Sequence, residues 1–338
     1  MNSPTAPAHP PDLGAAAAGW PTVTVAIPTY NRARWLRETL ASLAAHTYSG
    51  GSFEVLVIDN RSTDTTAEIA QSFLPGRPTW RYLLETAQGA NHARNRAVQE
   101  ATGEILVLLD DDVLLQPGWL DALVEPWRRP SSAEHPIAAV GGEVIPIYPE
   151  GCPKWLERWA TPLRLRPDPG PLTPRQMPMS ANLAFHRSVF AEFGLFRTDL
   201  GRKGKNVFSG DESELLKRYH RAGREVWFAP SAVAQHQFPL TRLNLRYTCR
   251  HSFDSARSRV LEAVTTGSSL TERVGYCLSR FLANFLKGLF LSLGILFLWL
   301  TGQGDRARQA TIRLTRCGGY LYETVASLPK AFAPPLSA

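Results

Sequence analysis

The chain has 338 residues, of which 44% are hydrophobic and 20% are charged. This content supports one large globular domain with an appendage, or two modest domains, and it excludes a polar disordered chain. The four cysteines form no C-x-x-C pair and lie near no metal-type histidine spacing. They suit free thiols in a reducing compartment, and a zinc or disulfide framework is not expected.

The lead-in and the middle of the chain lack regular patterning. Residues 1–21 are rich in proline and alanine and have no basic segment before an apolar core. This composition predicts a disordered lead-in without a secretion signal, and hence a cytoplasmic location. Residues 146–178 are dense in Pro, Trp and Arg, which predicts a long loop over the site. We expect a globular domain at residues 22–240 and a helical region at residues 241–338.

Apolar strands alternate with helices through the first two thirds of the chain. The predicted strands are short apolar runs that cover residues 22–27, 53–58, 80–84, 104–109 and 225–229. The predicted helices cover residues 34–45, 65–73, 90–101 and 212–222. Near-continuous apolar strands alternating with helices predict a mixed, mostly parallel α/β sheet that is covered on both faces.

The C-terminal part combines positive charge with an apolar stretch. Residues 242–316 contain twelve Lys or Arg against four Asp or Glu, an excess of +8 in a chain whose net charge is +7. In residues 281–300 the strongly polar residues are Asn284 and Lys287 alone, and they share one helix face with Arg280. This pattern predicts an interfacial helix on an anionic membrane surface, with its polar side toward the headgroups. A single spanning helix and a buried core helix remain alternatives.

Nucleic acid is not an expected partner. The basic residues flank an apolar helix and do not interleave with aromatic residues on a sheet, which is the usual pattern of a nucleic-acid surface.

Polar residues follow three of the predicted strands. The runs are PTYNR at residues 28–32, DNRSTD at residues 59–64 and DDD at residues 110–112. In an open parallel sheet, ligands bind outside the carboxyl ends of the strands, so these runs are expected at one rim. Adjacent carboxylates repel one another unless a cation offsets them, and hard oxygen donors suit Mn²⁺ or Mg²⁺. The rim therefore predicts a nucleotide diphosphate held with a divalent metal, and a solvated turn with a helix N-cap is the alternative.

Five segments carry a resemblance to a known family. TVAIPTYNR, EVLVIDNRSTDTT and GANHARNRAVQEATGEILVLLDDD resemble the donor half of family 2 glycosyltransferases. SANLAFHRSVFAEFGLF and SGDESELLKRYHRAGREVWFAPSAVAQH resemble the acceptor half, so the likeness spans residues 22–237. It implies a GT-A fold and inverting transfer from a nucleotide-sugar, by default a UDP-hexose, to a glycan or lipid-linked hydroxyl. No Gln-x-x-Arg-Trp motif follows Asp211, which favours transfer of a single sugar.

The resemblance assigns donor contacts residue by residue. Thr29 and Tyr30 match positions that cradle the base and ribose, and Asp59 matches the carboxylate that reads the base. Asp64 lies in the adjoining turn, where a helix N-cap is an equal alternative. Arg94 matches a cationic position that faces the diphosphate.

The metal assignment rests on the D-x-D pair. Asp112 is the expected metal ligand and Asp110 is expected to contact ribose or a water. Asp111 occupies the variable middle position and is included among the residues expected to bind the nucleotide-sugar. His236 matches a position that completes the metal shell in some members, and imidazole suits Mn²⁺ better than Mg²⁺. A structural histidine is the alternative.

The expected general base lies at residues 211–212. The family usually carries Glu-Asp before the acceptor-side helix, whereas this chain has Asp211-Glu212 in inverted order. Glu212 is the favoured base and Asp211 the alternative; an acidic helix N-terminus without a catalytic role is the third interpretation. The inversion also motivates a competing hypothesis, a nucleotide-sugar-binding protein with impaired catalysis. Trp155, Trp159 and Trp227 are candidate sugar-stacking platforms, with core packing favoured for Trp227.

Overall fold

The computed structural model describes residues 17–128, 136–157, 162–203, 208, 210–266 and 269–333. The chain divides into two compact units. One comprises Met1–Ile145, Pro162–Leu195 and Leu216–His236, and the other comprises Pro146–Thr161, Phe196–Leu215 and Gln237–Ala338. The assignment of functional domains to residues 22–240 and 241–338 stays a prediction.

The predicted lead-in lies outside the described residues as far as residue 16. In the described part, residues 17–21, the Trp20 ring packs edge-on against Tyr48 with 5.4 Å between the ring centroids.

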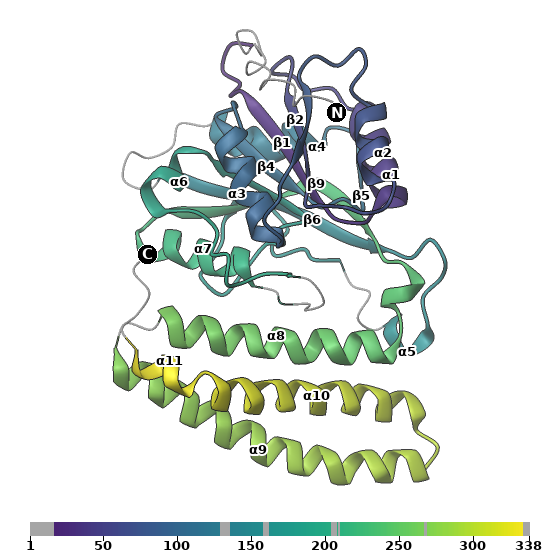
Figure 1. Cartoon of the computed structure of the whole chain (residues 1–338), viewed down its shortest axis with the longest axis vertical. Helices are drawn as coiled ribbons and strands as arrows, with labels where there is room; N and C mark the ends of the chain where they lie inside the picture. Colours follow the sequence, from purple (N-terminus) through teal and green to yellow (C-terminus); the bar gives the residue numbers. More distant parts are fainter. Residues whose placement is uncertain are drawn as a thin grey trace, which may run out of the picture. The chain divides into compact units, whose positions relative to one another are not determined.

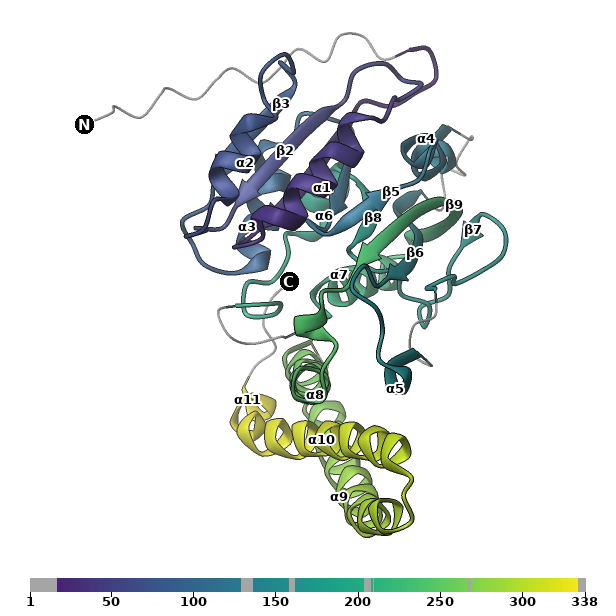
Figure 2. The same cartoon turned by 90° about the vertical axis from the view of Figure 1, so that its right-hand side faces the viewer.

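The first unit is built on a mixed sheet. Over the described residues its strand order is β3-β2-β1-β4-β8-β6-β9-β5, with β7 paired to β9 (Figures 1 and 2). The strands are β1 (Val23–Thr29), β2 (Glu54–Asp59), β3 (Trp80–Leu84), β4 (Ile105–Leu109), β5 (Val113–Leu115), β6 (Ile137–Ile147), β7 (Gly170–Pro171), β8 (Asn182–His186) and β9 (Glu225–Gln237). Strands β1 to β4 are mutually parallel, and β8 adds to β4 in antiparallel orientation. The predicted α/β fold class is confirmed.

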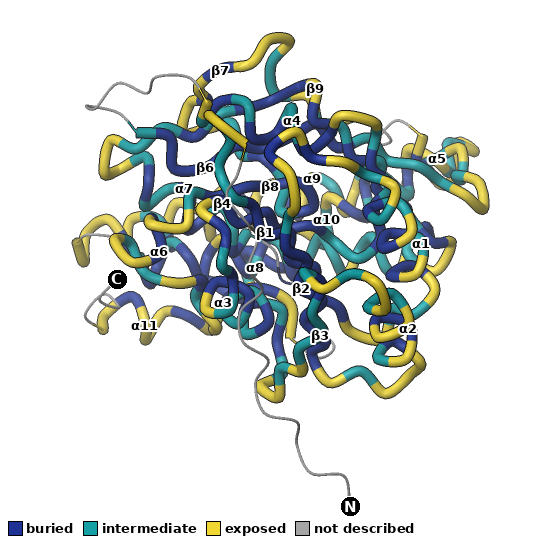
Figure 3. The backbone as a smooth tube through the Cα atoms, turned by 90° about the horizontal axis from the view of Figure 1, so that it is seen from above, coloured by how far each residue is buried: buried dark blue, intermediate teal, exposed yellow. Residues whose placement is uncertain are grey.

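The core explains why these segments form strands and helices. Strands β1, β2 and β4 are buried along almost their whole lengths, as Figure 3 shows, because helices cover both faces of the sheet. The helices that belong entirely to this unit are α1 (Ala33–Ala44), α2 (Thr66–Ser72), α3 (Ala90–Glu100), α4 (Trp119–Val124) and α6 (Ser188–Phe193). In α1 the apolar spacing places Leu36, Leu40 and Leu43 on the buried side.

The second unit is mainly helical. Its helices are α5 (Lys154–Glu157), α8 (Leu245–Thr266), α9 (Leu270–Leu300), α10 (Gly304–Ala326) and α11 (Leu328–Phe332), and α7 (Asp211–Arg221) begins in it. Helix α10 packs along both α8 and α9, whereas α8 and α9 contact each other more sparsely (Figure 1). Ser269 caps α9 by accepting a hydrogen bond from the Glu272 backbone N–H at 3.1 Å.

Helix α9 is long and apolar enough to cross a membrane by length and composition, and only 6% of its most apolar window is buried. The alternative of a buried core helix is therefore wrong. The expectation that Asn284 turns toward headgroups is also wrong. Asn284 is 9% exposed and shares the buried stripe of α9 with Cys277 and Gly288, because this side packs against its neighbours in the helical unit.

Candidate active site

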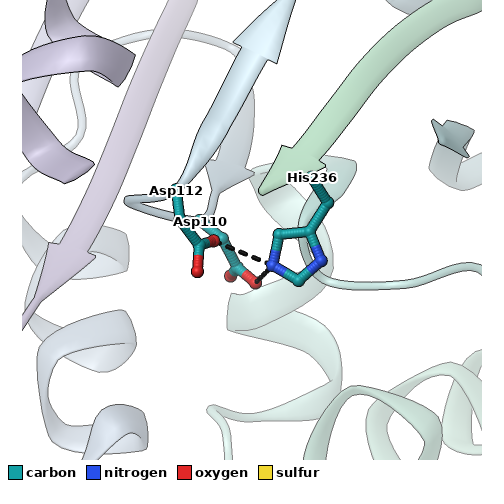
Figure 4. Close-up of side chains that lie close together, drawn as sticks. All are labelled: Asp110, Asp112 and His236. Carbon is teal, nitrogen blue, oxygen red and sulfur yellow. Dashed lines mark ion pairs between the residues drawn. The ribbon is translucent and has the colours of Figure 1, made fainter. Parts of the chain in front are cut away.

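Three side chains that could hold a metal ion meet at the end of β4. Strand β5 follows the aspartates directly and pairs with β9 in a register that sets Val113 opposite His236. His236 therefore points at the aspartates, with Nε2 2.8 Å from Asp112 Oδ1 and 4.0 Å from Asp110 Oδ2 (Figure 4). The Asp112 side chain is 3% exposed and that of Asp110 is 37% exposed, so the group is open on the Asp110 side.

The donor set fits a divalent cation. One ligand atom from each of Asp110, Asp112 and His236 lies within 4.8 Å of the others. Octahedral ligands about 2.1 Å from an ion stand about 3 Å apart when adjacent and about 4.2 Å apart when opposite, so the spacing is compatible. Two carboxylates with one imidazole favour Mn²⁺ over Mg²⁺.

Arg32 neutralises the other side of the aspartate run. Its guanidinium forms ion pairs with Asp111, at 3.4 Å between Nε and Oδ1, and with Asp112. Although burial opposes its charge, Asp111, Asp112 and Asp110 together raise the pKa of Arg32 above its ordinary value. The sequence showed a cation after β1 but not its partners. Arg32 lets the carboxylates lie close together within the fold.

Asp111 has partners other than the candidate metal ligands. Its Oδ2 accepts a hydrogen bond from the Thr29 hydroxyl at 2.7 Å, and its Oδ1 faces Arg32. Burial, with a smaller contribution from Asp112, raises the pKa of Asp111 to about 6, against the opposing effects of Arg32 and Thr29. Thr29 is itself 4% exposed, so in this structure it orients Asp111. The predicted nucleotide contacts of both residues stay predictions.

The loops after β1 and β2 brace each other. Asn31 has a left-handed φ of 52° and accepts a hydrogen bond from the Thr63 backbone N–H at 2.6 Å. Asp64 accepts from the backbone N–H of Ala33 at 3.3 Å and of Thr66 at 3.0 Å, and so ties the starts of α1 and α2 together. These contacts support the structural alternative for Asp64, and its contact with the nucleotide-sugar stays a prediction.

The other residues predicted to bind the nucleotide-sugar lie near the same strand ends. Asp59 is 1% exposed and accepts hydrogen bonds from the Tyr82 hydroxyl and the Ser62 backbone N–H, both at 2.8 Å. Tyr30 is 42% exposed, which leaves its ring open to stacking. Arg94 donates to the Asn91 side chain at 2.9 Å and to Ser180 Oγ at 3.1 Å.

Asn182 is a supporting residue that the sequence reasoning did not single out. It lies opposite Leu109, at the last position of β4, and its side chain is fully buried. It accepts from Trp119 Nε1 at 2.8 Å and donates to the backbone oxygens of Glu143 and Ala232 at 3.1 and 2.7 Å. The sequence signal that could have identified Asn182 is its position in SANLAFHR, which is part of a segment that resembles the family. These bonds join β8 to β6 and β9 just where the aspartates begin.

The expected bases open α7 in the second unit. Asp211 is 5% exposed, Glu212 is half-buried and Glu214 follows at 4% exposed. Acidic residues in the first turn also suit the helix macrodipole, so the structural alternative stands beside the catalytic one. Trp155 lies half-buried in α5, whereas Trp159 lies outside the described residues.

Trp227 is half-buried and packs against the core of the first unit, donating to Glu225 at 2.6 Å. This agrees with the packing role favoured for it.

The sheet and the carboxylate–imidazole group at its rim define the class, a nucleotide-sugar glycosyltransferase of GT-A fold. The chain belongs to the family described as Glycosyl transferase family 2, whose model matches residues 24–194. The family resemblance found in the sequence is thereby confirmed.

Two relatives come from Haloferax volcanii. Glycosyltransferase AglE is 30% identical over 217 residues, which cover 64% of this chain and 67% of that protein. Glucosyl-dolichyl phosphate glucuronosyltransferase is 24% identical over 221 residues, which cover 64% of this chain and 69% of that protein. The fold is similar to mannosyltransferase PcManGT from Pyrobaculum calidifontis, solved in complex with GDP-Man and Mn²⁺. The TM-score is 0.62 at 20% identity, over 94% of this chain and 89% of that one.

Proposed function

We propose that the enzyme transfers a single sugar, with inversion, from a UDP-hexose to a hydroxyl of a lipid-linked acceptor at the cytoplasmic membrane surface. The observation that carries the proposal is the convergence of Asp110, Asp112 and His236 at the carboxyl end of β4. One H. volcanii relative is named for a dolichyl phosphate-linked acceptor, which supports the acceptor class.

A divalent ion held by Asp110, Asp112 and His236 would supply charge stabilisation to the departing diphosphate. Asp59 would accept from an N–H of the base, Tyr30 would stack against the nucleotide, and Arg94 would face the diphosphate. In the transfer step the acceptor oxygen bonds to the anomeric carbon while the bond from that carbon to the diphosphate breaks. Glu212, or Asp211 in its place, would take the hydroxyl proton as this bond forms.

Exposed apolar side chains support the membrane part of the proposal. Helix α9 exposes Phe290 at 77% and Leu300 at 78%, within a continuous apolar face. Soluble monomers avoid apolar patches of this kind, so a membrane interface is the environment that we propose for it.

A donor screen tests the reaction. Purified protein with Mn²⁺ is offered UDP- and GDP-linked hexoses with and without a lipid-linked acceptor, and nucleotide release is measured. We expect release from a UDP-sugar that rises with acceptor and stops with excess EDTA. Release from GDP-sugars alone would contradict the donor assignment, and release that survives EDTA would contradict the metal site.

The second candidate function is a nucleotide-sugar-binding protein with impaired catalysis. The inverted order of Asp211 and Glu212 is the observation that favours it. This alternative would be established if the protein binds a nucleotide-sugar with micromolar or tighter affinity but neither transfers nor slowly hydrolyses the sugar with any acceptor.

A further inference from the structure

A cluster of arginines in the helical unit belongs to neither the donor site nor the expected base. Arg259 on α8, Arg280 on α9 and Arg316 on α10 converge on Tyr320. The Arg280 guanidinium carbon lies 5.1 Å from the Tyr276 ring centroid and 6.0 Å from that of Tyr320. Arg259 and Arg316 act on the Tyr320 hydroxyl and lower its pKa. Three positive charges from three helices are thus gathered around one phenol.

These arginines keep their charge available to a ligand. All three are exposed, and none forms an ion pair with a carboxylate among the described residues. Each guanidinium has about five N–H donors, more than a single hydroxyl can accept. Although burial would raise the pKa of Tyr320, Arg259 and Arg316 lower it, which shows how strongly their charge acts at this position. Uncompensated cations in such proximity are the arrangement that a phosphate stabilises.

A second observation on α9 points the same way. Arg273 lies two turns before Arg280 on the same stripe of the helix and is 5% exposed. Its Nε and Nη1 atoms have no hydrogen-bond partner among the described residues. A buried guanidinium with two unpartnered nitrogens is costly, so an anion reaching this stripe would stabilise the fold as well as the complex.

The helix packing decides how α9 meets a membrane. Helix α10 packs along α9, so the two must enter a bilayer together or not at all. The charged residues of α10 are Asp305, Arg306, Arg308, Arg313, Arg316 and Glu323. Charges at the bilayer centre are costly, which excludes a spanning α9–α10 hairpin. Helix α9 would therefore lie in the plane of one leaflet.

The in-plane orientation brings the arginines to the phosphates. At 100° per residue, Arg280 and Lys287 lie nearly opposite the exposed leucines of α9. A helix is about 10 Å across, and interfacial helices sink about 5–10 Å into the headgroup and acyl boundary. The flank that carries Arg280 and Lys287 then lies at headgroup level while the apolar face reaches the acyl chains.

We propose that Arg259, Arg280 and Arg316 form a binding site for the headgroup phosphate of an anionic membrane phospholipid. This proposal rests on the membrane association in the proposed function. It adds a defined phosphate-binding site, formed by three arginines, in place of general attraction by a basic surface.

Vesicle flotation of the full-length chain tests the site, with phosphatidylcholine vesicles that contain or lack phosphatidylglycerol. The cluster variant carries Arg259→Gln, Arg280→Gln and Arg316→Gln. The control variant carries Arg246→Gln, Arg250→Gln and Arg306→Gln, which removes the same charge from exposed arginines away from Tyr320. We expect about a 100-fold loss of affinity for phosphatidylglycerol vesicles in the cluster variant, at a factor of about five for each residue, and less than about fivefold in the control.

Tyr320→Phe separates a built site from diffuse attraction, because it removes the hydroxyl on which Arg259 and Arg316 act without changing the net charge. We expect a several-fold loss of the preference for phosphatidylglycerol, with an unchanged melting temperature and unchanged donor binding. Equal losses in the cluster and control variants, together with wild-type binding by Tyr320→Phe, would overturn the site.

The remaining outcomes separate this proposal from the proposed function. Wild-type binding that is equal with and without phosphatidylglycerol overturns the phosphate site and leaves membrane association standing. Wild-type protein that binds no vesicle overturns both. Stabilisation by inorganic phosphate, lost in the cluster variant and without any lipid preference, would identify free phosphate as the ligand. Tighter binding to duplex DNA than to vesicles would replace the lipid with nucleic acid.

Discussion

The strand-end rim of the first unit and helix α9 of the second unit differ in which side chains they bury and which they expose. At the rim, charged side chains are buried only where they meet partners, as Asp112 meets Arg32 and His236, and the apolar strands beneath are fully covered. On α9 the polar Asn284 is buried between helices, whereas Phe290 is 77% exposed.

The difference teaches that the two regions are folded for different surroundings. Buried ion pairs are weak contributors to stability, so a paired group such as Arg32, Asp111 and Asp112 is better explained by binding than by folding. Exposed leucines and phenylalanines in a continuous face carry an unfavourable hydration free energy that only an apolar partner removes. These features support the proposal that the rim binds an anionic ligand with a metal and that α9 meets a lipid interface.

Removing Asp112 is expected to have the largest effect on the rim. Asp112→Ala should lower transfer by about 10³-fold or more, because the diphosphate loses several kcal/mol of metal stabilisation. The measurement is nucleotide release at saturating donor with Mn²⁺, beside a thermal melt. Asp112→Asn, which keeps the size of the side chain, should be nearly as inactive. Full activity in either variant would show that the metal is held elsewhere.

Polar substitutions on the exposed apolar face of α9 should weaken vesicle binding. Leu289, Leu293, Leu296 and Leu300 are 59–78% exposed, so changing them to Gln should alter the free energy of unfolding by less than about 0.5 kcal/mol each. A buried leucine contributes about 1.5–3 kcal/mol, so even half of that at four positions predicts at least about a 100-fold loss of vesicle binding.

The matched control for these substitutions is Leu84→Gln with Leu240→Gln, two exposed leucines outside α9. Vesicle binding should be unchanged in this control. Retained binding by the α9 variant would remove the lipid explanation for the apolar face.

The third prediction sharpens the catalytic assignment at α7. Glu212→Gln and Asp211→Asn should both slow transfer, with about a 10²-fold loss in the one that removes the base, and we favour Glu212. Donor affinity, measured by calorimetry, should survive in both. Unchanged turnover in both variants at saturating donor would place the base elsewhere.

Sequence periodicity was sufficient for the parallel half of the sheet. Strand β3 has the predicted bounds, and β1, β2 and β4 differ from theirs by one or two residues, because apolar runs flanked by polar or turn residues have clear limits. Strand β9 was expected to stop at Ala229, before Pro230. It continues to Gln237 through a proline that the ladder accommodates. Strands β6 and β8 were not predicted, since short apolar runs do not reveal their pairing.

The site was predictable as a list of residues but not as a geometry. The aspartates at the end of β4 could be found because their position after an apolar strand is local. The pairing of Val113 with His236 joins residues far apart in the chain, and no local pattern encodes it. In the same way, spacing placed Asn284 on one face of a helix with Arg280 but could not show that Asn284 would be buried.

The smallest expected effect concerns Asp64, where a loop brace and a donor contact make different predictions. Asp64→Ala removes the acceptor of the Ala33 and Thr66 backbone N–H groups and should lower the free energy of unfolding by about 1 kcal/mol, as loss of a cap does. Although burial would raise it, the hydrogen bonds from Thr66 and Ala33 lower the pKa of Asp64. A lowered carboxyl pKa stabilises the fold above the unfolded-state pKa, and this contribution is lost as the pH falls through the folded-state value. Melting curves of the wild type and the variant should therefore differ at neutral pH and converge in acid, with the donor KM unchanged. A raised donor KM at an unchanged melting temperature would instead establish the nucleotide contact.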